Sequence, residues 1–96
     1  MQTVMNIGHA LKICRSAKRL SLDAVSTKSG LSRSYLSMIE SGKREPTLSA
    51  VEKIVRALQI PLPIVLFLAA DSEELEGLDS ETIKGLSAAA LEVMKA

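Results

Sequence analysis

The chain has 96 residues, which is enough for one domain but not for two independent cores, and its 47% hydrophobic and 24% charged residues exclude a disordered chain. With only 2% aromatic residues the core must consist of aliphatic side chains, which favours packed helices over sheets, so we expect an all-α fold. The net charge of +1 hides an asymmetry: residues 1–60 hold ten Lys and Arg against four acids, and residues 61–96 hold two Lys against seven acids, so the first part could face a polyanion and the second should face away from it.

Three short helices are expected in the first half of the chain, because apolar residues recur there at helical spacing. Asn6, Ser21 and Ser32 can cap the first, second and third of them. Gly30 and Gly42 follow the second and third helices, where a glycine commonly ends a helix. The expected ranges are about 7–18, 22–29 and 33–41.

Three further helices are expected in the second half. Pro46-Thr47 opens the fourth. Pro61 and Pro63 are tolerable only in the first turn of a helix, so the fifth helix should start there. Residues 71–79 are acidic and loop-like. The expected ranges are about 46–58, 62–70 and 80–94, with Asp79 or Ser80 as the cap of the last helix.

Several classes of site are excluded by composition. Cys14 is the only cysteine and His9 the only histidine, so neither an intramolecular disulfide nor a zinc site of Cys/His type can form, and we expect a cytoplasmic protein. The most apolar segment, residues 60–70, is shorter than the roughly 20 residues that span a bilayer. Paired carboxylates, phosphate-binding loops and nucleophile motifs are absent from the sequence. We therefore expect no enzymatic activity, no cofactor, no metal and no membrane contact.

The second and third expected helices are separated only by residues 29–32. So short a connection makes the two helices cross steeply, with Leu31 and Leu36 filling the angle between them. This is the connection of a helix-turn-helix, whose second helix enters the major groove in DNA-binding proteins. The alternative is an ordinary helical hairpin without a ligand, because short glycine-containing turns between helices are common.

The segment SYLSMIESGKREPTL, residues 34–48, carries the most specific pattern of the chain, with I-E-x-G-K-x-x-P at a fixed distance after the turn. Through this segment the chain resembles the helix-turn-helix domain of the phage lambda repressor and Cro type, also called the xenobiotic-response-element class. The matching residues are Ile7-Gly8, Leu11, Arg15, Leu20-Ser21-Leu22, Val25, Ser29-Gly30-Leu31-Ser32, Tyr35-Leu36, Ile39-Glu40, Gly42-Lys43-Arg44, Pro46-Thr47-Leu48 and Leu58. The resemblance implies a lambda-repressor-like bundle of five helices and a sequence-specific transcription regulator, usually dimeric.

The resemblance covers about residues 6–70, so we assign residues 1–70 to a helix-turn-helix domain. Residues 71–96, an acidic linker and an extra C-terminal helix, are interpreted from their pattern alone. Three residues depart from the family's pattern: Leu22 stands where the family often has a phosphate-contacting Gln, Ser26 replaces Ala, and Ser29 replaces a residue that is commonly apolar. We expect the fold to survive these changes with looser local packing.

The front end of the third helix is the expected reading surface, because the first residues of a helix in the major groove reach the base edges. By matching to the family, Arg33 and Ser34 hold the positions of its principal base-reading side chains, and Ser37 and Met38 are further candidates. Arg33 can donate two parallel hydrogen bonds to guanine O6 and N7, and Met38 could pack on a thymine methyl group. The alternative for Arg33 is a solvated side chain, although the helix dipole disfavours a cation there.

Neighbouring side chains are expected to hold the sugar–phosphate strands, which fixes the register without reading sequence. The loop at residues 42–44 offers backbone N–H groups and two cations, and serine-capped helix N-termini are ready anion sites. Tyr35 either belongs to the core or bonds a phosphate through its hydroxyl. The expected phosphate contacts are Ser21, Ser32, Tyr35, Ser41, Lys43, Arg44 and Thr47.

The resemblance also implies an ion pair between Arg15 and Glu40, which in relatives locks the recognition helix to the scaffold. Two separate solvated charges are the alternative.

The fifth helix, LPIVLFLAA, is apolar all round, so one face can cover the bundle and the rest needs another cover. The side chains concerned are Ile64, Phe67 and Leu68. Either the sixth helix folds back over them, or a second copy of the chain does. A two-fold dimer would place two recognition helices one DNA turn apart, about 34 Å, over a palindrome.

The sequence therefore predicts a DNA-binding transcriptional regulator, a repressor that binds a palindromic operator in double-stranded DNA as a homodimer. Two alternatives stay open. One is an antitoxin or other protein-binding module that uses its C-terminal helix on a protein partner. The other is the controller of a restriction-modification system.

Overall fold

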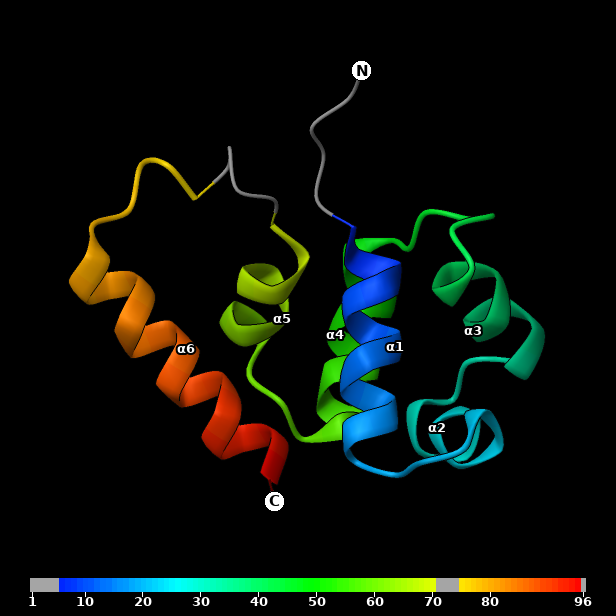
Figure 1. Ribbon diagram of the computed structural model, residues 1–96. Coiled ribbons are helices and arrows are strands. Elements are labelled where there is room, and N and C mark those ends of the chain that lie inside the picture. Colours follow the sequence, from blue (N-terminus) through cyan, green and yellow to red (C-terminus); the bar gives the residue numbers. More distant parts are fainter. Residues whose placement is uncertain (1–5, 71–74, 96) are drawn as a thin grey trace.

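The computed structural model describes residues 6–70 and 75–95, and every regular element within them is an α-helix (Figure 1). The prediction of an all-α fold is confirmed. The helices are α1 (Ile7–Ala17), α2 (Leu22–Ser29), α3 (Arg33–Glu40), α4 (Leu48–Leu58), α5 (Leu62–Ala69) and α6 (Ser80–Lys95). Their ends lie within two residues of the predicted ranges. The largest difference is at α4, which starts later because Thr47 is its N-cap and Pro46 lies outside it.

Side-chain oxygens cap the N-termini of five helices, because the first backbone N–H groups of a helix have no partner within it. In four of them a backbone N–H donates to the capping oxygen over 3.0 or 3.1 Å; the cap and donor pairs are Asn6 and His9, Ser21 and Ala24, Ser32 and Tyr35, and Thr47 and Ala50. Asp79 caps α6 by accepting from the N–H of Thr82 at 2.8 Å, and hydrogen bonds from Thr82 lower the pKa of this carboxyl group. The caps formed by asparagine, serine and threonine are each worth about 1 kcal/mol.

One hydrophobic core joins all six helices. Its most enclosed side chains are Leu11, Cys14, Val25, Leu36, Ile39, Leu58 and Val65, which come from α1 to α5. Ala90 of α6 is 5% exposed and belongs to the same cluster. The C-terminal helix therefore folds back onto the bundle.

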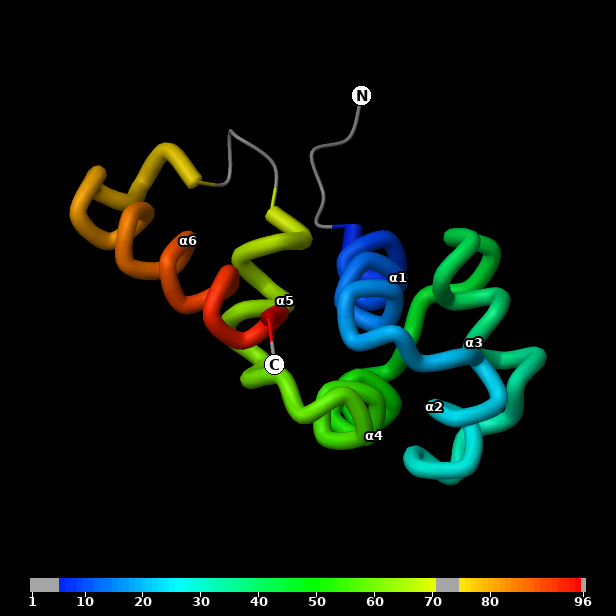
Figure 2. The backbone as a smooth tube through the Cα atoms, turned by 60° about the horizontal axis from the view of Figure 1, so that its bottom comes forward, coloured from blue at the N-terminus to red at the C-terminus, as the bar shows by residue number. Residues whose placement is uncertain are grey.

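The two ends of the molecule are formed by different parts of the chain. Helix α1 contacts α3 on one side and α5 on the other (Figures 1 and 2). As a result α2 and α3 lie at one end and α6 at the other. Helix α6 and the segment 75–79 before it, which hold the acidic residues Glu76, Asp79 and Glu81, lie at the end away from α2 and α3 (Figure 1).

None of the helices in the described ranges combines the length and the apolar composition that a membrane crossing requires.

Candidate nucleic-acid interface

In the turn between α2 and α3, serine hydroxyls bind both the carbonyl oxygen and the backbone N–H of Leu31. The hydroxyl of Ser26 donates to the carbonyl oxygen of Leu31 at 2.6 Å, and the N–H of Leu31 donates to the Ser29 hydroxyl oxygen at 3.2 Å. Gly30 adopts the left-handed conformation that ends α2, with φ of 80°. Ser26 and Ser29 therefore tie the turn by hydrogen bonds, where we had expected only looser packing from these two replacements.

The apolar side chains of α2 and α3 fix the angle between the helices. Val25 and Leu36 are each 2% exposed, and Leu31 is half-buried against the same core. Leu22 also packs on this cluster. Because the inward faces of both helices are occupied, the opposite face of α3 points to solvent.

The four predicted base-reading side chains gather on that outer face. Arg33, Ser34 and Ser37 are exposed, and Met38 is half-buried. All four line one open surface depression. The Nε of Arg33 forms an ion pair over 3.0 Å with Oδ1 of Asp23 on α2, a contact that the sequence did not suggest.

Three capping hydroxyls keep their hydrogens available for a further bond. The oxygens of Ser21, Ser32 and Thr47 accept backbone N–H groups, and all three residues are exposed. A hydroxyl that accepts one hydrogen bond can still donate another, so each can bind a phosphate oxygen. Ser41 differs, because its hydroxyl donates to the Met38 carbonyl at 3.2 Å and must leave it to reach a phosphate.

The loop after α3 offers side chains but not backbone donors. The N–H groups of Lys43 and Arg44 both donate to the Met38 carbonyl, at 2.9 and 3.2 Å, and that of Gly42 donates to the Ile39 carbonyl. The expectation that backbone N–H groups here hold phosphates is therefore wrong, because they close the C-terminus of α3 instead. The side chains of Lys43 and Arg44 are exposed and remain the donors of this loop.

Tyr35 lies half-buried at the edge of the core. The guanidinium carbon of Arg44 lies 5.5 Å from the centroid of its ring. This is the distance of a cation–π contact, which would restrict the arginine while leaving its N–H groups outward.

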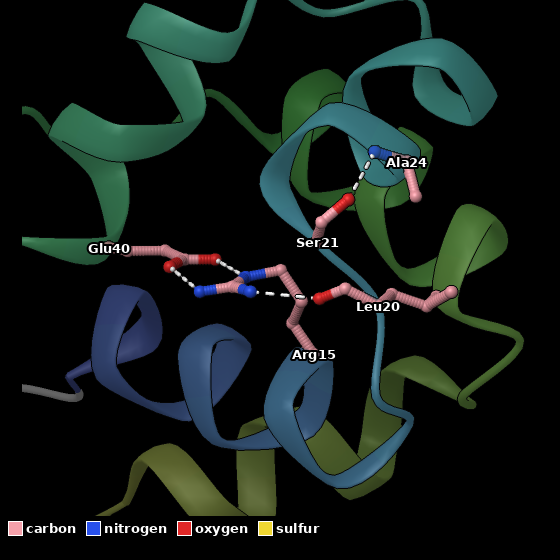
Figure 3. A network of polar contacts seen from close by, with 5 residues as sticks. All are labelled: Arg15, Leu20, Ser21, Ala24 and Glu40. Carbon is pink, nitrogen blue, oxygen red and sulfur yellow. Dashed lines mark hydrogen bonds and ion pairs between the residues drawn. The ribbon is translucent and has the colours of Figure 1, made fainter.

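A two-pronged ion pair joins α1 to α3, as the resemblance implies (Figure 3). Nε and Nη2 of Arg15 donate to the two carboxylate oxygens of Glu40 at 2.8 and 2.9 Å, and Nη1 donates to the carbonyl oxygen of Leu20 at 2.8 Å. The side chains are only 17% and 12% exposed. The hydrogen bond to Glu40 raises the pKa of Arg15. One guanidinium thus holds both the end of α3 and the segment that enters α2.

Gly8 is a positioning residue, and only the structure shows why glycine is needed there. Any Cβ at this position would overlap the carbonyl oxygen of Ile39 and come within 3.0 Å of its carbonyl carbon. Helices α1 and α3 therefore approach each other at a point where only glycine fits. The glycine is part of the family's pattern, but the sequence alone does not say what touches it.

The three residues expected in a dimer or tail-packing surface differ in their burial. Ile64 is 4% exposed and lies in the core of the bundle, so it needs no further cover. Phe67 and Leu68 are half-buried. Phe67 lines an apolar groove that runs between α5, the 75–78 segment and α6, together with Pro63, Leu66, Ala70, Leu75, Leu78 and Leu86.

Cys14 and His9 are not brought together. Cys14 is fully enclosed in the core, where burial raises the pKa of its thiol, and His9 is exposed on α1. Helical spacing places them on different faces, as expected for a core cysteine and a surface histidine.

Comparison with known proteins matches this region to one family. A helix-turn-helix family model matches residues 11–65. The chain is 37% identical over 65 residues to the transcriptional regulator ClgR of Mycobacterium tuberculosis, covering 68% of this chain and 58% of that protein. It is 32% identical over 71 residues to the transcriptional repressor RghR of Bacillus subtilis, covering 73% and 53% respectively. With the immunity repressor protein of Bacillus phage phi105 the identity is 34% over 62 residues, covering 65% and 43%.

The chain spans about half the length of these curated relatives. The family match runs from α1 into α5 and so contains the turn, the recognition helix and the ion pair that holds it. By this match and by its fold, the chain belongs to the helix-turn-helix family of the lambda repressor and Cro type.

Proposed function

We propose that this chain binds double-stranded DNA in a sequence-specific manner and regulates transcription. The observation that carries the proposal is the arrangement of Arg33, Ser34, Ser37 and Met38 around one depression on the outer face of α3. An α-helix fits the major groove, and side chains at its front end reach the base edges. Within the described residues no other helix covers this face, since Arg33, Ser34 and Ser37 are exposed and α5 and α6 lie at the opposite end of the molecule (Figure 1).

The surroundings of α3 suit the strands of a duplex. The N-termini of α2 and α3 carry exposed serine hydroxyls, and helix N-termini attract phosphate. Lys43 and Arg44 extend from the loop that follows α3, where they can neutralise phosphates without reading sequence. The Arg15–Glu40 ion pair would hold α3 at a fixed angle to these contacts.

We further propose that the chain acts as a homodimer on a palindromic operator and represses by occupying it. Two of the relatives are named repressors, which supports the direction of control. The apolar groove between α5 and α6 supports the dimer, because a second copy could cover it. Two recognition helices about 34 Å apart would then meet successive major grooves.

Selection of bound duplexes from a random pool tests the proposal, followed by titration of the selected duplex and of a random one. We expect Arg33→Ala to weaken binding to the selected duplex by about 1–3 kcal/mol and to relax the base preference at one position in each half-site. Lys43→Ala should weaken binding to both duplexes and flatten the salt dependence, because it removes one phosphate contact.

Lys84→Ala is the matched control, because Lys84 is exposed on α6 and its substitution removes the same charge far from α3. It should leave both affinities and the salt slope close to those of the wild type. Enrichment of no sequence by the wild type would refute sequence-specific binding. Equal losses on the two duplexes for Arg33→Ala would refute its base-reading role.

A further inference from the structure

The reading arginine is held by a carboxylate from the neighbouring helix. Nε of Arg33 lies 3.0 Å from Oδ1 of Asp23, which stands in the first turn of α2. Both side chains are largely exposed, at 66% and 79%, so the pair lies on the surface and not in the core. A duplex that meets the front of α3 would meet this pair as well.

A carboxylate at this place is unfavourable for a surface that is proposed to bind DNA, because DNA is also negatively charged. Only two acidic residues lie between Ser21 and Ser41, Asp23 and Glu40. Glu40 has an evident role, because both of its oxygens accept from Arg15. Asp23 instead brings a negative charge beside the expected phosphate contacts, where it should repel DNA unless it improves another contact.

The geometry of Arg33 indicates what that contact is. A guanidinium carries five N–H donors in a planar fork. Its Nε lies in the ion pair with Asp23, and within the described residues neither terminal nitrogen forms a hydrogen bond; these two nitrogens share one edge of the fork. That edge can donate both bonds to O6 and N7 of guanine. The anchored side chain also loses less conformational freedom on binding than a free one would.

We propose that Asp23 is a specificity-determining residue, which anchors Nε of Arg33, presents its terminal nitrogens to guanine and discourages Arg33 from binding phosphates. This inference rests on the proposed function, since it concerns the same reading surface. Asp23 is a positioning residue here, because it acts on the base through Arg33.

The placement of Asp23 has a second physical explanation. An acid in the first turn of a helix is favoured by the helix dipole, whatever lies beside it. That explanation predicts an effect of Asp23 on the stability of the fold alone. Our proposal predicts an effect on base discrimination, so the two differ in the measurement that responds.

The test uses duplexes selected by the wild-type chain, with one base pair exchanged at the position whose preference Arg33→Ala relaxes. Discrimination is the ratio of the dissociation constants for the exchanged and the selected duplex. In Asp23→Ala we expect this ratio to fall by roughly twofold to fivefold, the range that an exposed ion pair contributes. Affinity for a random duplex should stay the same or rise, because a negative charge has been removed.

Two further variants separate positioning from charge. Glu52→Ala removes the same charge from an exposed site on α4 and should leave the discrimination ratio unchanged. In the Arg33→Ala background Asp23→Ala should also leave it unchanged, because no anchored side chain is left. Asp23→Asn keeps a side-chain oxygen that can accept from Nε, so it should retain more discrimination than Asp23→Ala.

The outcomes distinguish this inference from the proposed function. If the wild type selects a sequence but its discrimination ratio equals that of Asp23→Ala, the proposed role of Asp23 is wrong and the proposal of DNA binding stands. The role of Asp23 would also be overturned if Asp23→Ala raised the affinity for the selected, exchanged and random duplexes by the same factor. Asp23 would then act only by repelling DNA. A wild type that binds no duplex would overturn both.

Discussion

At the scale of single residues, Gly8 sets how closely the recognition helix approaches α1. We expect Gly8→Ala to destabilise the chain by about 1–3 kcal/mol, because the added carbon would overlap the Ile39 carbonyl and force α3 away. Urea unfolding followed by circular dichroism measures this loss. Binding to the selected duplex should weaken as well, since α3 carries the side chains proposed to read the bases.

Gly85 is the matched control for this substitution. It lies inside α6, and a Cβ there would meet nothing within 4 Å. Gly85→Ala should stabilise the chain by roughly 0.5–1 kcal/mol, because alanine loses less backbone freedom than glycine in a helix. If the two substitutions changed the free energy of unfolding by similar amounts, the close approach of α1 and α3 would not be the cause.

At the scale of helices, Arg15 connects three segments through one guanidinium. We expect Arg15→Met to cost about 1.5–3 kcal/mol of unfolding free energy, because two hydrogen bonds to Glu40 and one to Leu20 are lost in a half-buried site. Arg56→Met on the exposed face of α4 provides the comparison. Equal costs in urea unfolding would mean that the ion pair does not stabilise the orientation of α3.

The positions of helices could be predicted from local signals, whereas several contacts of the site could not. Ser21, Ser32 and Gly30 mark helix ends by chemistry that operates over three or four residues, so the ranges were right within two residues. The Arg15–Glu40 pair was expected only because the family has it. The Asp23–Arg33 pair and the contact at Gly8 depend on which helix faces meet, which neither hydrophobic spacing nor capping specifies.

The same limit explains the error at the loop after α3. Exposed cations and a glycine predict a polar turn, and Lys43 and Arg44 are indeed exposed. Their backbone N–H groups were expected to be free for phosphates. The structure directs both to the Met38 carbonyl, because the last carbonyls of a helix need donors and the loop folds back to supply them.

At the scale of the whole molecule, we expect the oligomeric state to depend on the groove between α5 and α6. Leu78 lines this groove and is 39% exposed, so Leu78→Glu should leave the monomer folded while placing a charge where a second copy would pack. We expect the wild type to sediment as a dimer and Leu78→Glu as a monomer. Leu48→Glu, at a 67% exposed position at the start of α4, should remain a dimer.

The proposed dimer would also determine which sequences the chain reads. A monomer of Leu78→Glu retains α3 unchanged, so it should still prefer the half-site over a random sequence. It should lose the affinity that a dimer gains by binding both half-sites at once, a factor of roughly 10²–10⁴ on the full palindrome. Binding curves on half-site and full-site duplexes measure the two effects separately. A Leu78→Glu variant that stays dimeric would show that the partner copy packs elsewhere, whereas a monomeric wild type with full affinity for a single half-site would contradict the two-fold arrangement itself.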